Sequence, residues 1–96
     1  MIVLFREVAE EELLAAWSWY AAVDAAPATR FVARVEAAMA SAARNPEAYQ
    51  RIEGDIRHVR LRGFPHALYF RVVGEAIVVV AVFHLSRSPS KLKGRA

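Results

Sequence analysis

The segment from Arg57 to Arg95, RHVRLRGFPHALYFRVVGEAIVVVAVFHLSRSPSKLKGR, decides the fold of this chain. It predicts three successive strands, because apolar residues recur with a period near two and glycine-containing turns separate the runs. These turns fall at 63–65 and 73–75. The last run, Ile77 to His84, is almost continuously apolar, which is typical of a strand covered on at least one face. The C-terminal half is therefore expected to form a sheet of consecutive antiparallel strands.

The residues before this segment predict one more strand and two helices. Ile2 to Phe5 is a short apolar run suited to a buried strand. Apolar residues at helical spacing then predict one helix over about Ala9 to Ala25 and a second over about Pro27 to Arg44. Asn45-Pro46 ends the second helix, and residues 47–55 are expected to be a polar connector. The short break between the helices implies an antiparallel helical hairpin.

The predicted order is β-α-α-β-β-β, an α+β two-layer domain with a mostly antiparallel four-stranded sheet. Counting directions through short loops makes the first strand antiparallel to the second and the fourth. The helical hairpin would cover one face of the sheet, and the other face would have no layer of its own and so would be available to a partner. Residues 1–96 are read as a single domain, with a basic tail at 88–96.

Charge divides the chain into two halves. Residues 51–96 carry nine Lys/Arg against three Asp/Glu, a net charge of +6, and residues 1–50 carry four against seven, a net charge of −3. Such an asymmetry favours a polyanion or an acidic partner on the basic side. The longest apolar run, Ala76 to Phe83, is too short to span a membrane. With no signal peptide recognised either, a cytoplasmic protein is expected.

Cysteine is absent, so neither a disulfide nor a thiolate metal site can form. The three histidines, His58, His66 and His84, would lie on three different strands. No Asp or Glu at regular spacing supplies a fourth ligand, so no metal is expected, and no cofactor is expected.

Four ordered motifs resemble those of the RelE/ParE superfamily of toxins from type II toxin–antitoxin systems. They are the aromatic end of the first helix at 17–20 (WSWY), the second helix with its Asn-Pro stop at 31–46, the Arg…FPHALYF pattern at 57–70, and VVVAVFHLSRSP at 78–89. The resemblance is greatest to the ParE-like, plasmid-stabilisation branch and covers nearly the whole chain. The closing motif is half kept, since Leu92 stands where tryptophan is usual and Arg95 follows it.

The resemblance implies two alternative activities. ParE-like members inhibit DNA gyrase by binding and do no phosphate chemistry, and a cognate antitoxin neutralises them. RelE-like members are ribosome-dependent endoribonucleases that cut mRNA. In those nucleases an arginine precedes the tyrosine of the middle strand by three positions, where this chain has His66, and the tail after Arg87 has neither His nor Tyr. Both departures favour a ParE-like toxin that is not an enzyme. A degenerate, non-toxic member is a further alternative, prompted by Leu92, and a homo-oligomer is left open.

Candidate functional residues fall into three sets. If the chain is RelE-like, the catalytic residues are His66, His84, Arg71 and Arg87. The residues expected to bind the target or nucleic acid are Arg57, Arg60, Arg62, Arg87 and Arg95. The residues expected to bind a partner are Trp19, Tyr20 and Leu92. For the basic residues the alternative is a solvated sheet face, and for the aromatic residues it is the core. Trp19 cannot share a helical face with both Trp17 and Tyr20, so it is the strongest candidate for contact with a partner.

Overall fold

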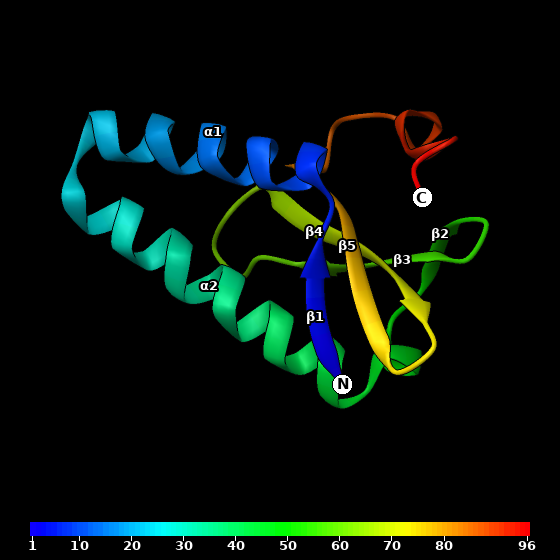
Figure 1. The fold of residues 1–96 in the computed structure, drawn as a ribbon. Coiled ribbons are helices and arrows are strands. Elements are labelled where there is room, and N and C mark those ends of the chain that lie inside the picture. The colour runs from blue at the N-terminus through cyan, green and yellow to red at the C-terminus, as the bar shows by residue number, and fades with distance from the viewer.

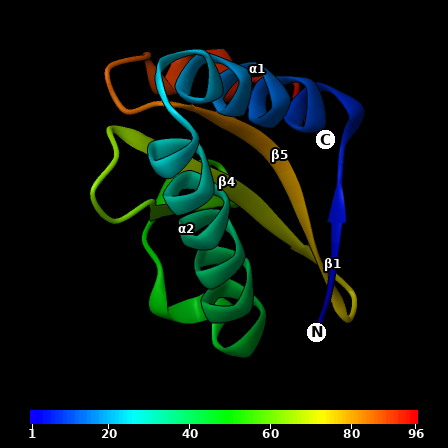
Figure 2. The same cartoon turned by 90° about the vertical axis from the view of Figure 1, so that its left-hand side faces the viewer.

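A computed structural model describes all residues 1–96, and it contains two α-helices and five strands. The elements, in chain order, are β1 (Ile2–Phe5), α1 (Glu7–Val23), α2 (Ala25–Arg44), the 3-10 turn η1 (Pro46–Ala48), β2 (Arg51–Glu53), β3 (Ile56–Arg60), β4 (His66–Val73), β5 (Ala76–His84) and the 3-10 turn η2 (Pro89–Leu92). The helices diverge as a V from their junction and lie on one side of the sheet (Figure 1). From that side, α2 runs in front of β4 and α1 lies along the upper end of the sheet (Figure 2). Neither helix is long and apolar enough to cross a membrane.

The predicted α+β class is confirmed, but two details of the sheet were wrong. The strand order is β1-β5-β4-β3-β2, so the sheet has five strands rather than four. The extra strand, β2, lies in the predicted connector and pairs with β3 across a tight turn in which Gly54 adopts φ 57°. Glycine tolerates this left-handed conformation, so the polar segment can fold back within two residues.

The first strand is parallel to the last, not antiparallel to it. Ile2 pairs with Ala76 and Phe5 with Val79, in a parallel register. The direction count failed because it missed β2, which adds one reversal of the chain before β3, so that β5 runs in the same direction as β1. The remaining neighbours are antiparallel, as expected for consecutive short-turn strands.

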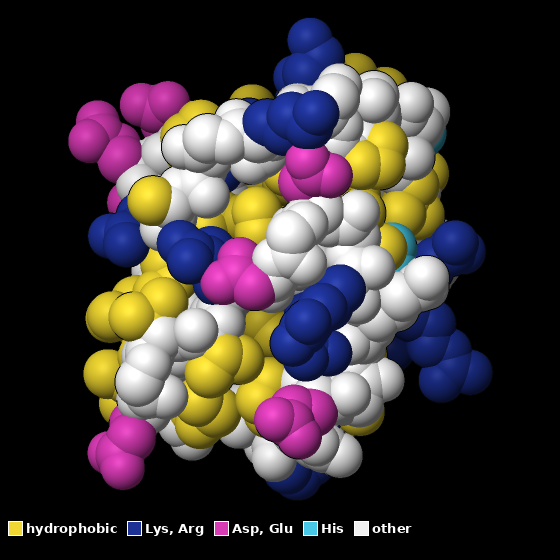
Figure 3. All heavy atoms as spheres, turned by 90° about the vertical axis from the view of Figure 1, so that its right-hand side faces the viewer, with side chains coloured by type: hydrophobic (Ala, Val, Ile, Leu, Met, Phe, Trp, Pro, Cys, Tyr) yellow, Lys and Arg dark blue, Asp and Glu magenta, His cyan; other side chains and the backbone are white.

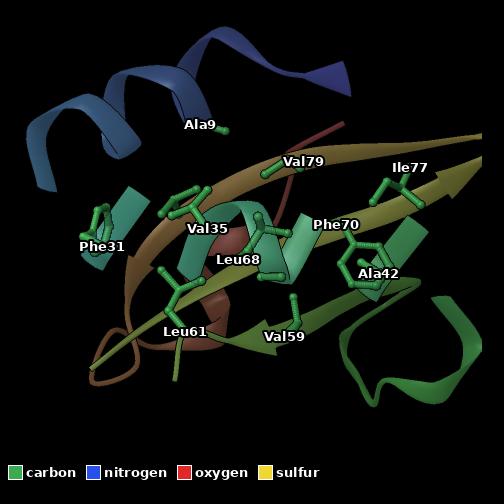
Figure 4. Close-up of a cluster of buried hydrophobic side chains, with 12 residues drawn as sticks. Ala9, Phe31, Val35, Ala42, Val59, Leu61, Leu68, Phe70, Ile77 and Val79 are labelled. Atoms are coloured by element: carbon green, nitrogen blue, oxygen red, sulfur yellow. The ribbon is translucent and has the colours of Figure 1, made fainter. Parts of the chain in front are cut away.

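The main core lies between the helices and the sheet. The predicted stripe of α2 is buried here at Phe31, Val35, Ala38 and Ala42. Figure 4 shows this stripe facing side chains of the sheet, which are Val59, Leu61, Leu68, Phe70, Ile77 and Val79. Helix α1 contributes less, since only Ala9 on it is fully buried and Trp17 is partly exposed.

A β-bulge at Val80 changes which face of the sheet the residues of β5 occupy. Tyr69 pairs with Ala81 and Phe70 with Val79, so Val80 has no partner on β4. A bulge of this kind shifts the alternation of side chains by one residue. Ile77, Val79 and Val82 consequently join the core under the helices, whereas Val80 and Ala81 both belong to a second cluster on the opposite face.

That opposite face is covered by the C-terminal segment, which the sequence left without structure. Leu92 in η2 is 0% exposed and packs into the second cluster with Tyr69 and Phe83. Ser88 caps η2, because its hydroxyl accepts a hydrogen bond from the backbone N–H of Ser90. The expectations that this face has no layer of its own, and that Leu92 binds a partner, were therefore wrong.

Candidate functional site

His66 and His84 meet where β4 begins and β5 ends. The two residues are paired in the register, and their ring centroids are 5.6 Å apart. They line a hollow of about 350 Å³ together with Trp19 and Tyr20 of α1. All four side chains are predicted candidates, and the structure brings them together here.

The electrostatics of the hollow favour a neutral imidazole. Burial, and secondarily the neighbouring His84, lowers the pKa of His66 from its usual value near 6.5. The buried Nδ1 of His66 has no hydrogen-bond partner in the protein. His84 is exposed, and its Nδ1 accepts a hydrogen bond of 3.0 Å from the backbone N–H of Ser86. A neutral imidazole can accept or donate a proton, which is the chemistry of a general base or of polar recognition.

The arginines proposed to assist these histidines lie elsewhere. Arg71 is five residues along β4, about 17 Å from His66. There it donates two hydrogen bonds of 3.0 Å to Asp55, one to each carboxylate oxygen, and this contact lowers the pKa of Asp55. Arg87 is 3.5 Å from the carboxylate of Glu12 and lies over the ring of Phe83. The four residues of the nuclease set are thus not assembled into one site.

The predicted set of target-binding arginines is dispersed as well. Arg57 faces the helices and donates to the backbone carbonyl of Tyr49 at 2.6 Å. Arg60 is exposed on the opposite face of the sheet, and Arg62 lies in the loop that follows β3. On the face that Figure 3 shows, Lys/Arg and Asp/Glu side chains alternate over the surface rather than forming a single basic patch.

Arg95 belongs to a structural cluster around Glu12. Its guanidinium donates to both oxygens of the Glu12 carboxylate, at 2.8 and 3.1 Å, and to the carbonyl of Val80 at 3.0 Å. Glu12 also accepts from the backbone N–H of Val82 at 3.1 Å. β1 pairs with β5 only as far as Val79. Beyond that point, the side chains of Glu12 and Arg95 form hydrogen bonds with the backbone of β5 that a neighbouring strand would otherwise form.

Two of the three predicted partner-binding residues remain accessible. Trp19 is 66% exposed and makes an edge contact with Tyr20, with the ring centroids 5.1 Å apart. Tyr20 is half-buried between Phe31 and Phe64, and burial raises the pKa of its hydroxyl. Leu92 lies in the core and is unavailable to a partner.

A further hollow, between the two helices, was not predicted. A groove of about 610 Å³ runs between α1 and α2 above β1. Its lining is almost wholly apolar, with two carboxylates among Phe5, Glu10, Leu13, Leu14, Trp17, Val32, Val35, Glu36 and Met39. The sequence signal for this groove was the adjacent apolar pair Leu13 and Leu14, because two neighbouring residues on a helix make the apolar face wider than a single buried stripe. No group of three His, Asp or Glu side chains is arranged to hold a metal ion.

Comparison with known proteins points to one family. The family model described as the ParE toxin of the type II toxin–antitoxin system, parDE, matches residues 3–89. A search of the curated proteins found no match. Among solved structures, the chromosomal ParDE TA system from P. aeruginosa is similar, with a TM-score of 0.76 and 17% sequence identity over 90% of this chain and 97% of that chain. At this identity the likeness concerns the fold.

Proposed function

Since this chain belongs to the ParE toxin family of type II toxin–antitoxin systems, we propose that it arrests growth by binding DNA gyrase and that a cognate antitoxin neutralises it. Gyrase is the target that the resemblance to ParE-like toxins implies. The observation that carries the antitoxin half of the proposal is the apolar groove between α1 and α2, because exposed apolar surface of this kind marks interaction sites.

The groove suits an amphipathic segment of an antitoxin. Leu14 is 62% exposed, and Trp17 and Val32 are also exposed on the two helices that form the walls. A helix laid into such a groove inserts apolar side chains at positions i, i+3 or i+4, and i+7. Glu10 and Glu36 are the charged residues of the lining, so the bound segment would carry Lys or Arg beside its apolar anchors.

The alternative of a ribonuclease has one observation in its favour, the contact of His66 with His84 in a shared hollow. Two observations oppose it. Arg71 pairs with Asp55, far along β4 from that hollow, and Arg87 pairs with Glu12 of α1. Cleavage of RNA requires cations positioned at the phosphate whose charge develops in the transition state. A non-enzymatic toxin therefore agrees better with the arrangement of these side chains.

Induced expression of the chain in a bacterial host distinguishes the two functions. DNA supercoiling and mRNA integrity are measured when growth stops. The proposal predicts altered supercoiling with intact mRNA, and the same arrest in the variant H66A/H84A. Arrest with cleaved mRNA that disappears in H66A/H84A would establish the ribonuclease instead. Growth without arrest would identify a non-toxic member of the family.

A charge placed in the groove tests the antitoxin site. Leu14→Glu should weaken binding of the co-expressed antitoxin at least about tenfold, because a buried carboxylate without a partner is costly. Toxicity should persist, since none of the arginines expected to bind the target lines the groove. Val23→Glu is the matched control, because Val23 is 68% exposed and does not line the groove. Equal binding of the antitoxin to both variants would exclude the groove as its site.

A further inference from the structure

Three arginines converge on a second hollow, on the opposite flank of α2 from the apolar groove. Arg30 and Arg34 are one helical turn apart on α2, and Arg62 comes from the loop between β3 and β4. Together they line a hollow of about 420 Å³ beside Phe64 and Tyr20. The distribution of charge along the sequence did not single out this cluster, because two of the three arginines lie in the acidic half of the chain.

The local structure holds Arg62 in place. Leu61, the residue before it, is buried in the main core. Gly63, the residue after it, adopts φ 84°, which glycine tolerates, and the backbone N–H of Phe64 donates to the carbonyl of Leu61 at 2.9 Å. The backbone on both sides of Arg62 is thus fixed, while its side chain remains exposed toward α2.

None of the three guanidinium groups is neutralised. The ion pairs of the molecule use Arg71, Arg87 and Arg95, and no carboxylate lies within 4.0 Å of Arg30, Arg34 or Arg62. No hydrogen bond from their side chains to another part of the protein is formed either. Several unpaired guanidinium groups around one hollow form a site for an anion, and arginine binds phosphate through two parallel hydrogen bonds.

The hollow next to it has an aromatic lining. The arginine hollow and the histidine hollow share Tyr20 and Pro65 as a common wall. On the far side of this wall lie the exposed ring of Trp19 and the two histidines. His66 is neutral at physiological pH, because burial lowers its pKa. The combined surface therefore has one cationic end and one aromatic end.

We propose that this surface binds a nucleotide, with its phosphates on Arg30, Arg34 and Arg62 and its base against Trp19. A base presents a flat aromatic face that stacks on tryptophan and polar edges that a neutral histidine can meet. An acidic peptide would satisfy the arginines but would bring no group that fits the aromatic end. The ligand is either a free nucleoside phosphate or a nucleotide of a single strand, which share this chemistry.

The site is separate from the apolar groove. On α2 the groove is lined by Val32, Val35 and Met39, whereas the arginine hollow is lined by Arg30 and Arg34. At about 100° per residue these two sets lie on opposite flanks of the helix, with the buried stripe between them. A nucleotide and a segment in the groove are therefore expected to bind at the same time.

Fluorescence of Trp19 provides the test. The variant W17F leaves Trp19 as the only tryptophan, so its emission, excited at a wavelength that nucleotides do not absorb, reports stacking of a base. ATP and hexathymidylate are titrated separately at low salt. We expect saturable quenching by at least one of the two probes. ATP alone would identify a free nucleotide, and hexathymidylate alone would identify a strand.

Matched variants in the same background decide the site. R30Q/R34Q should weaken binding at least tenfold, and R62Q by about threefold or more. R44Q/K93Q removes the same charge from exposed positions outside the hollow and should change binding less than twofold. The proposal is overturned if neither probe gives saturable quenching, or if R44Q/K93Q weakens binding as much as R30Q/R34Q. It is also overturned if oligoglutamate binds through these arginines and neither nucleotide probe competes with it.

Discussion

The carboxylate of Glu12 in α1 binds the guanidinium of Arg95, 83 residues later, through hydrogen bonds of 2.8 and 3.1 Å. Their side chains are 16% and 19% exposed, so the pair is mostly shielded from water. Arg95 also lies over the ring of Phe83, 5.4 Å from its centroid. The contact fastens the C-terminal segment to the first helix and keeps Leu92 in the second cluster of the core. The last strand ends at His84, so the stability of the fold depends on residues that follow the sheet in the sequence.

Removing this anchor should destabilise the protein. Glu12→Ala leaves the Arg95 guanidinium without its carboxylate partner and the N–H of Val82 without its acceptor, so the free energy of unfolding should fall by about 2–3 kcal/mol. Urea denaturation monitored by circular dichroism measures this change. Glu11→Ala, at the exposed neighbouring position, should change stability by less than about 0.5 kcal/mol. Equal values for the two variants would contradict the role assigned to Glu12.

Leu92 should behave as a core residue. Truncation to alanine removes apolar atoms that are wholly buried, and Leu92→Ala should cost about 2–4 kcal/mol of unfolding free energy. Leu92→Met preserves most of the volume and should cost less than about 1.5 kcal/mol. Thermal and urea unfolding give both numbers. If Leu92→Ala kept full stability but lost binding to the antitoxin, Leu92 would be a contact residue after all.

The ion pair between Arg71 and Asp55 should contribute little to stability, although its geometry is good. The carboxylate of Asp55 is more than half exposed, and pairs exposed to water are screened by solvent and salt. Asp55→Asn should therefore change the free energy of unfolding by less than about 1 kcal/mol. A loss well above this, measured by urea denaturation at two salt concentrations, would show that the turn between β2 and β3 depends on the pair.

Two histidines should make the fold sensitive to mild acid. Burial lowers the pKa of His58 and of His66, so each binds its proton less readily in the folded chain than in the unfolded chain. As pH falls below the unfolded value near 6.5, the unfolded state gains protons first and stability decreases until the folded pKa is passed. Urea denaturation between pH 7.5 and 5.5 should show this decrease.

The variant H58Q/H66Q should have a flatter stability profile over the same range of pH. Glutamine keeps a polar side chain at both positions but does not titrate. His84→Gln should have a smaller effect in the same direction, since it removes a neighbour that helps to lower the pKa of His66. An unchanged slope in H58Q/H66Q would assign the acid sensitivity to other groups.

Much of the fold follows from local patterns that the sequence carries directly. Spacing of apolar residues predicted both helices, and the end of α2 at Arg44 follows from Asn45-Pro46, since proline prevents the helix from continuing. The hairpin of β4 and β5 follows from Gly74, which adopts φ 58° in a tight turn. β2 escaped prediction because its three residues, of which only Ile52 is apolar, form a strand only when β3 lies beside them.

The candidate site was less accessible to prediction, because it depends on register and on crossing angles. Pairing of His66 with His84 could be stated only once β4 and β5 were aligned. Arg57 and Arg71 lie on opposite faces of the sheet, since Arg57 pairs with Phe70, the neighbour of Arg71. Sequence spacing alone does not give the register between separate strands.

The class of the fold, the helical hairpin, the three consecutive strands and the family can be predicted from the sequence, because they depend on periodicity, turn residues and the order of motifs. The parallel pairing of β1 with β5, the burial of Leu92 and the convergence of Arg30, Arg34 and Arg62 become visible only in the folded molecule. These features arise where segments distant in sequence meet. The parallel pairing follows from the extra reversal at β2, and Leu92 is buried where η2 packs on the second cluster, and a local pattern encodes neither.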